Sequence, residues 1–336
     1  MSLNILIEPC TVPAGTEVAR PPAETSAVSV NYSLAKVVAI LTVTAGHWFT
    51  GTILWIPVTF GLMVFAFSSG YFTSAHYGPR VDRQRFWRKK LERLGLRYWI
   101  LLGFIAALVA LKGGTVAHWH SLVHLFGLSG VLNWANVSSA SGMGAGLWFF
   151  TLLLLFYLTY PYLAQAVASK RAAVMVVAGG FVLAVLLEEQ VKVGHELWLT
   201  TFGFVAGVAW GAHRPRLPAG WMLALTMLLW GLLLALNVLG IKYMNTVLIA
   251  SGGLAVAIWL TVAELPRLRV LKGVAILDKY LLEIFLVHTY LFVHPTGVSG
   301  MDFAISLVLI MAVSVLLSVL ADKVSARMFR ERAGER

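Results

Sequence analysis

The sequence predicts an all-α integral membrane protein, a bundle of about ten transmembrane helices. Of its 336 residues, 59% are hydrophobic and only 12% are charged, and the mean hydropathy is +0.81, values typical of membrane proteins and not of soluble domains. The apolar residues form long runs, and clusters of Lys and Arg stand at every second gap between them. The net charge of +11 therefore indicates membrane topology, and we expect no nucleic acid partner.

Each expected span is a run of about 20 mostly apolar residues, the length that crosses about 30 Å of hydrocarbon. We expect residues 1–32, which lack a signal-peptide pattern, to form a flexible cytoplasmic tail, residues 33–322 the transmembrane domain, and residues 323–336 a basic cytoplasmic tail. The chain has a single cysteine, Cys10, which excludes an intrachain disulfide. The ten spans are expected near residues 33–53, 55–75, 94–111, 146–166, 172–188, 196–212, 218–238, 243–263, 275–295 and 302–322.

The loops alternate in charge, which predicts their sides, because short cytoplasmic loops carry the excess of Lys and Arg. Every second loop is basic, and the loops that alternate with the basic ones carry few Lys or Arg residues. Ten spans with both termini in the cytoplasm satisfy this alternation. The basic loops are residues 76–93, 170–171, 214–216, 267–279 and the C-terminal tail.

The basic segment, residues 80–97, leads into the third span and holds a net charge of +6. Such charge indicates the cytoplasmic side of the membrane and contact with anionic lipid. The charge exceeds what topology needs, however, and fixed Arg donors suit the phosphates of a nucleotide-like ligand. As a helix, the segment would place Lys90, Arg93 and Arg97 on one face. Its apolar face would carry Trp87, Leu91, Leu94 and Tyr98.

The first span carries two polar residues, Lys36 and His47, eleven positions apart. Eleven residues are almost three helical turns, so the two side chains share one face and lie about 16 Å apart. Lys36 could anchor an anion at the inner mouth while His47, deep in the protein, exchanges a proton with a hydroxyl. Alternatively, Lys36 reaches the membrane surface and His47 is a hydrogen-bonded structural histidine.

The ninth span contains Glu283, His288 and His294. A carboxylate in lipid is costly, so Glu283 is a functional candidate. It could orient a histidine, bind a substrate, or pair with Lys279 or another base. If the span is one helix, Glu283, Val287, Tyr290 and His294 form a polar stripe.

The longest outer segment, residues 112–145, is rich in Trp, His, Asn, Ser and Gly. Aromatic faces beside amide and imidazole groups suit a sugar, although an interfacial aromatic belt has the same composition. His118, His120 and His124 lack a nearby carboxylate or cysteine, so we expect no metal site.

Several local patterns together resemble the acyltransferase 3 family of membrane proteins, which acylate bacterial surface glycans and some small molecules. Two departures keep the charge but change the donor geometry: the family has Arg where this chain has Lys36 and Lys90, and Lys lacks the bidentate fork of Arg. The family's proline after the basic core is also absent. The matching motifs are Lys36 with His47, FAFSSGYF at 65–72, the basic core at 90–93, WFFTLLLLFYLTYP at 148–161 and LDKYLLEIFLVH at 277–288.

The resemblance implies an acetyltransferase in the bacterial inner membrane that uses acetyl-coenzyme A, or another acyl-coenzyme A, as donor. His47 would act as general base or acyl carrier, and Glu283 would be a second catalytic candidate. The acceptor would be a glycan or a lipid-linked saccharide. The donor phosphates would bind Lys36, Arg88, Lys90, Arg93 and Arg97.

Two other functions remain open at this point. A transporter of lipid-linked sugars or organic anions would also need inner basic clusters and buried polar residues, but the sequence shows no inverted repeat. A membrane cytochrome could use His47 and His288 as axial haem ligands.

Overall fold

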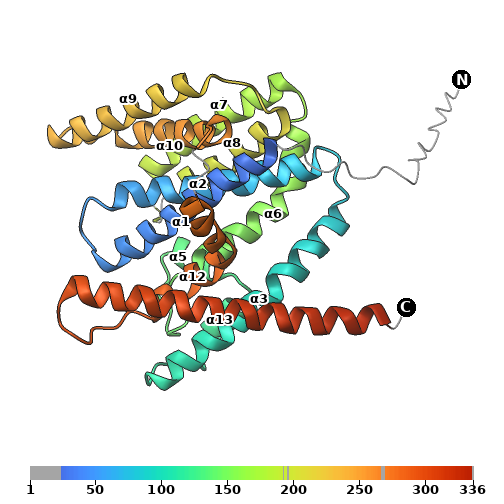
Figure 1. Cartoon of the computed structure of the whole chain (residues 1–336), viewed down its shortest axis with the longest axis vertical. Helices are drawn as coiled ribbons and strands as arrows, with labels where there is room; N and C mark the ends of the chain where they lie inside the picture. The colour runs from blue at the N-terminus through green and yellow to red at the C-terminus, as the bar shows by residue number, and fades with distance from the viewer. Residues whose placement is uncertain (1–23, 192, 195–196, 266–268, 335–336) are drawn as a thin grey trace, which may run out of the picture.

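The computed structural model describes residues 24–191, 193–194, 197–265 and 269–334, in which every regular element is helical (Figure 1). Residues 1–23 of the predicted tail, with Cys10, and residues 266–268 lie outside the described residues. The elements are α1 (Glu24–Trp48), α2 (Trp55–Tyr77), α3 (Arg83–Leu111), α4 (Trp119–Leu125), α5 (Ser129–Trp134), α6 (Trp148–Ala166), α7 (Lys170–Gln190), α8 (Leu197–His213), α9 (Ala219–Val238), α10 (Asn245–Val262), α11 (Arg269–Ala275), η1 (Ile276–Tyr280), α12 (Leu281–Val287), η2 (His288–Tyr290) and α13 (Ser299–Gly334).

The predicted fold class is confirmed. Within the described ranges, eight helices are long and apolar enough to span a membrane. The predicted sixth span corresponds to α8, which has 17 residues. The predicted ninth span corresponds to η1, α12 and η2. α1 begins at Glu24, before the predicted start of the first span, and α13 continues to Gly334 through residues predicted as a tail. The helices above that length and hydropathy are α1, α2, α3, α6, α7, α9, α10 and α13.

The loops predicted to be basic lie together at one end of the bundle, called here the basic end. His213, the last residue of α8, donates a hydrogen bond to the carbonyl of Val167 after α6 (2.8 Å), and Arg214 donates to the carbonyl of Ala75 near the end of α2 (3.0 Å). The first turns of α1 and the last turns of α13 lie on the same side of the molecule (Figure 1).

The opposite end, called the far end, joins the loops with little charge. Here Trp48 at the end of α1 donates to Ser299 at the start of α13 (3.0 Å). Lys112, after α3, donates to the carbonyl of Tyr290 (2.7 Å). The alternation that the loop charges predict is therefore present in the fold.

α2 and α8 pack with their backbones almost touching, because glycines recur at every fourth position of α8. A Cβ atom added to Gly207 would lie 2.1 Å from the carbonyl oxygen of Phe67, and one added to Gly211 would lie 2.4 Å from that of Tyr71. Small residues at such spacing allow close approach of membrane helices. This contact fixes α2, which supplies one wall of the site described below.

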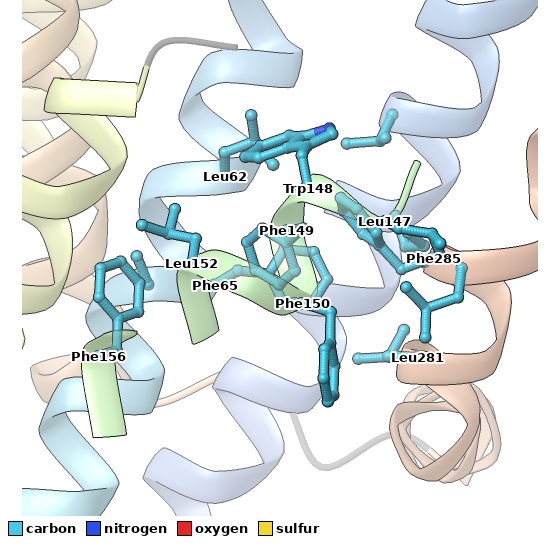
Figure 2. Packing of buried hydrophobic residues seen from close by; sticks show 14 of the residues in the cluster. Leu62, Phe65, Leu147, Trp148, Phe149, Phe150, Leu152, Phe156, Leu281 and Phe285 are labelled. Atoms are coloured by element: carbon cyan, nitrogen blue, oxygen red, sulfur yellow. The ribbon is translucent and has the colours of Figure 1, made fainter. Parts of the chain in front are cut away.

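An aromatic and aliphatic cluster fills the space between α2, the start of α6 and α12 (Figure 2). The rings of Phe149 and Phe285 have centroids 4.4 Å apart, and Phe65 packs edge-on against Phe285 at 6.5 Å. Aromatic pairs of this geometry add to the stabilisation from burial. The cluster holds α12 in place beside α1.

The ninth span is not one helix. It is broken into η1, α12 and η2, residues 276–290, called here the broken segment. The side chain of His288 hydrogen-bonds the carbonyls of Ile284 and Phe285 in the last turn of α12. The predicted stripe from Glu283 to His294 is therefore wrong, because His294 follows the break and stacks on Trp48 with centroids 4.6 Å apart.

Candidate active site

A pocket of about 280 Å³ opens at the far end of α1. His47, at the last turn of α1, is accessible from it. The wall combines apolar side chains with the indoles of Trp55 and Trp148 and the hydroxyl of Thr52. The lining residues are Val43, Gly46, His47, Phe49, Gly51, Thr52, Leu54, Trp55, Val58, Leu62 and Trp148.

His47 is in contact with His288 of the broken segment. The ring centroids are 5.1 Å apart and the rings are tilted by 46°. His288 is fully buried, and its Nδ1 lies 2.8 Å from the carbonyl oxygen of Phe285. A carbonyl only accepts, so Nδ1 carries the proton and Nε2 keeps a lone pair.

This geometry does not fit the haem function. Two axial imidazoles of one haem lie on opposite sides of the iron and its porphyrin. The rings of His47 and His288 are too close together for that arrangement.

Lys36 lies on the same side of α1 as His47, because it also contacts the broken segment. Its Nζ is 2.6 Å from Oδ1 of Asp278, and Ser33 donates to Oδ2 of the same carboxylate (2.8 Å). The predicted common face of Lys36 and His47 is confirmed. Asp278, which the sequence reasoning missed, already balances the charge of Lys36.

Arg97 meets a second carboxylate of the broken segment. Its Nη1 lies 2.8 Å from Oε1 of Glu283, and its Nη2 pairs with Asp322 of α13. The side chain of Glu283 is 1% exposed and that of Asp322 is 66% exposed. Of the partners considered for Glu283, the structure thus provides a base, but this base is Arg97. Lys279 lies instead over the ring of Tyr280, 4.6 Å from its centroid.

The broken segment therefore touches the predicted site at three regularly spaced positions. Asp278 contacts Lys36, Glu283 contacts Arg97, and His288 contacts His47. The three lie five positions apart in the chain, with four residues between each and the next. The LDKYLLEIFLVH motif contained all three residues, but nothing local in it indicates their partners.

The other predicted donor-binding residues lie along the first turns of α3. Lys90 is half-buried over the ring of Tyr157, 4.1 Å from its centroid, with Tyr77 and Phe86 beside it. Arg88 and Arg93 are exposed.

The predicted division of α3 into two faces is wrong in part. Lys90 and Arg97 face the bundle, while Leu91 of the expected apolar face is 54% exposed. The reason is the position of Phe86: this ring is buried, and Lys90 follows it by one helical turn.

The outer segment forms a hydrogen-bonded cap with the short helices α4 and α5. Nδ1 of His124 lies 2.8 Å from the hydroxyl of Ser129, and its Nε2 lies 3.0 Å from that of Ser139. Burial, and secondarily the nearby His120, lowers the pKa of His124. In the part of the chain that the structure describes, no three His, Cys, Asp or Glu side chains are grouped so as to hold a metal ion.

The sequence model of the acyltransferase 3 family, which describes an acyltransferase domain, matches residues 30–323. The chain belongs to the acyltransferase 3 family. Comparison with curated proteins and with solved structures finds no match. The protein is therefore a membrane acyltransferase, and its family resemblance covers the pocket, the broken segment and the start of α3.

In this acyltransferase 3 protein, the predicted site residues form two groups. His47 stands at the far end with His288, and the basic residues stand toward the basic end, two of them held by carboxylates of the broken segment. α1 joins the two groups, since Lys36 and His47 lie on one side of it. A site that reaches across the bundle is the arrangement that suits a donor and an acceptor arriving from opposite sides.

Proposed function

We propose that this acyltransferase moves an acetyl or short acyl group from acyl-coenzyme A to a hydroxyl of a surface polysaccharide or a lipid-linked sugar. The observation that carries the proposal is the position of His47. His47 lies in a pocket at the far end of α1. Lys36 lies on the same side of this helix, toward the basic end. We place the protein in the bacterial inner membrane, with the basic end and both termini in the cytoplasm, where the donor is made.

The donor phosphates would bind at the basic end. Arg88 and Arg93 are exposed there and present fixed guanidinium donors. Lys36 and Arg97 are paired with Asp278 and Glu283, so a phosphate would share or displace these partners. Lys90 would contribute its charge from the aromatic surface of Tyr157.

The acyl transfer needs a group that takes the proton of the acceptor hydroxyl. His47 would take this proton as the hydroxyl oxygen forms a bond to the thioester carbonyl carbon. The carbon–sulfur bond then breaks, and the leaving thiolate receives the proton from the His47 imidazolium. In the covalent variant, a His47 nitrogen forms a bond to the thioester carbonyl carbon, the carbon–sulfur bond breaks, and the leaving thiolate takes the proton of the other ring nitrogen. The acceptor hydroxyl then attacks the acyl carbon, the carbon–nitrogen bond breaks, and the hydroxyl proton goes to the ring of His47.

The acceptor would enter the pocket from the far end. Trp55 and Trp148 offer aromatic surface and Thr52 offers a hydroxyl, a combination that suits a sugar ring. Trp48, which follows His47 in the chain, stacks on His294 and adds an aromatic pair at the far end.

The test is transfer of label from radiolabelled acetyl-coenzyme A in membranes that contain the protein, with extracted envelope glycans as acceptor. We expect His47→Ala to lower the transfer about 10²- to 10⁴-fold, the usual contribution of a general base. The matched control is His76→Ala, since His76 is an exposed histidine at the end of α2. Full transfer by His47→Ala would remove the role of His47, and no transfer to any glycan or lipid-linked sugar would contradict the proposed acceptor class.

A further inference from the structure

We propose that His288 is a positioning residue for His47. Its Nε2 accepts a hydrogen bond from one ring N–H of His47, which leaves the other His47 nitrogen unprotonated and directed at the pocket. The proposal rests on the proposed function, in which His47 acts as base or acyl carrier.

The backbone fixes the protonation of His288. Its Nδ1 faces two carbonyl oxygens, those of Phe285 (2.8 Å) and Ile284 (3.2 Å). Both groups only accept hydrogen bonds, so the proton stays on Nδ1. The ring then offers a single acceptor, the lone pair of Nε2.

That acceptor has no partner in the described structure. Nε2 of His288 is buried and makes no hydrogen bond. Buried polar atoms are rarely left without a hydrogen-bond partner, because an unpaired one keeps its full desolvation cost. Two of the rings around His288 are apolar, Phe285 and Phe292, with centroids at 5.9 and 6.0 Å. His47, at 5.1 Å, is the polar ring in this contact.

A small rotation of the His47 ring completes the hydrogen bond. His288 itself is held, because its Nδ1 is anchored and the residues before it are tied to α1 by Lys36–Asp278 and to α3 by Arg97–Glu283. His47 is at the last turn of α1 and borders open space, so it is the ring free to turn. The arrangement follows the general rule that a catalytic base is itself oriented by a third group.

The test compares His288→Asn with His288→Gln. The Asn amide lies near the position of Nδ1 and keeps the contact with the carbonyl of Phe285. The longer Gln amide reaches toward the position of Nε2 and offers an acceptor to His47. We expect His288→Asn to lower kcat about 10- to 100-fold, as loss of an orienting partner does for metal-binding histidines, with KM for acyl-coenzyme A unchanged. His288→Gln should recover most of the loss, and equal activity of the two variants would overturn the proposal.

A second measurement needs neither donor nor acceptor. Diethylpyrocarbonate modifies unprotonated imidazole nitrogens, and mass spectrometry reports the rate at each histidine. We expect slower modification of His47 in His288→Asn, restoration in His288→Gln, and no change at His76, the internal control. An unchanged rate at His47 in His288→Asn would overturn the proposal.

The wild-type protein provides a test that does not depend on any substitution of His288. With ¹⁵N-labelled histidine, the two ring nitrogens of His47 should show one fixed tautomer, assigned by its loss in His47→Gln. A mixture of both tautomers would overturn the proposal. A single tautomer without any acyl transfer would support the histidine pair and contradict the proposed function, so the two failures are distinguishable.

Discussion

Lys36 shows how a predicted ligand-binding charge can be compensated inside the free protein. Its ammonium group is 2.6 Å from Asp278, and both side chains are partly exposed, at 19% and 26%. A pair that water partly reaches is screened and contributes less to stability than a fully buried one. Its main effect is to reduce the charge available to an incoming phosphate.

We therefore expect Asp278→Asn to lower the KM for acyl-coenzyme A several-fold, because Lys36 no longer shares its charge with a carboxylate. Lys36→Met should raise the same KM. Steady-state kinetics with membranes at fixed acceptor concentration measure both. The matched control is Ser33→Ala, which removes a hydrogen bond to Asp278 without changing any charge. A higher KM in Asp278→Asn would contradict the interpretation.

At these residues the sequence predicts position but not partners. The spacing of Lys36 and His47 is set by the geometry of one helix, so their common face follows from local rules. Asp278 lies 245 residues from Ser33 in the chain, and no periodicity relates two segments so far apart. His288 was visible as a buried histidine, but its contact with His47 requires the packing of the broken segment against α1.

At the scale of the elements, the ion pairs of Arg97 link α3 to α12 and α13. Arg97 joins all three helices through Glu283 and Asp322. Glu283 is almost fully buried, so loss of Arg97 would leave its charge without a partner. Loss of Glu283 would leave Arg97 with Asp322.

We expect Arg97→Met to destabilise the protein by about 3–5 kcal/mol, the usual cost of an unpaired buried charge. Glu283→Gln should cost less, and adding it to Arg97→Met should recover part of the loss. Asp322→Asn, at an exposed position, should stay within about 1 kcal/mol of the wild type. Unfolding in detergent followed by circular dichroism measures these differences. If the effects of Arg97→Met and Glu283→Gln simply add, the two residues do not act as a pair.

A second prediction at the scale of the elements follows from the tight contact of α2 and α8. Gly207→Ala should destabilise the protein by about 1–3 kcal/mol, the cost of overpacking, because its Cβ would lie 2.1 Å from the carbonyl oxygen of Phe67. Gly231→Ala in α9 is the matched control, since a Cβ there meets open space and Ala favours a helix by about 0.5–1 kcal/mol over Gly. The same unfolding measurement serves, and equal stability of the two variants would show that the contact is looser than described.

Helix positions were largely predictable at the scale of the elements, while irregular geometry was not. Apolar length alone located the eight long spans. The break between Ile276 and Tyr290 was missed because its residues are as apolar as those of a continuous span. The segment packs through Phe285 against Phe149, a tertiary contact that the local sequence does not indicate.

The two ends of the whole molecule differ in the way that the proposed function requires. The basic loops meet at one end, through contacts such as His213 with Val167, and the pocket with His47 opens at the other. In the proposed reaction, the donor binds the basic end and the acceptor enters the far end. A cytoplasmic donor and a surface acceptor can both reach the protein in this way if the two ends face different compartments. The orientation in the membrane is therefore a prediction on which the direction of acyl transfer depends.

Accessibility of single cysteines in intact cells tests this orientation. In a Cys10→Ser background, Lys242→Cys places a thiol in the exposed loop after α9, at the far end, and Arg216→Cys places one in the exposed loop after α8, at the basic end. Both substitutions remove one positive charge at an exposed position, so each controls for the other. We expect a membrane-impermeant maleimide to label Lys242→Cys on intact cells and Arg216→Cys only after permeabilisation, because excess Lys and Arg mark the cytoplasmic side. The reverse pattern would place the pocket in the cytoplasm, and a surface glycan could then no longer be the acceptor.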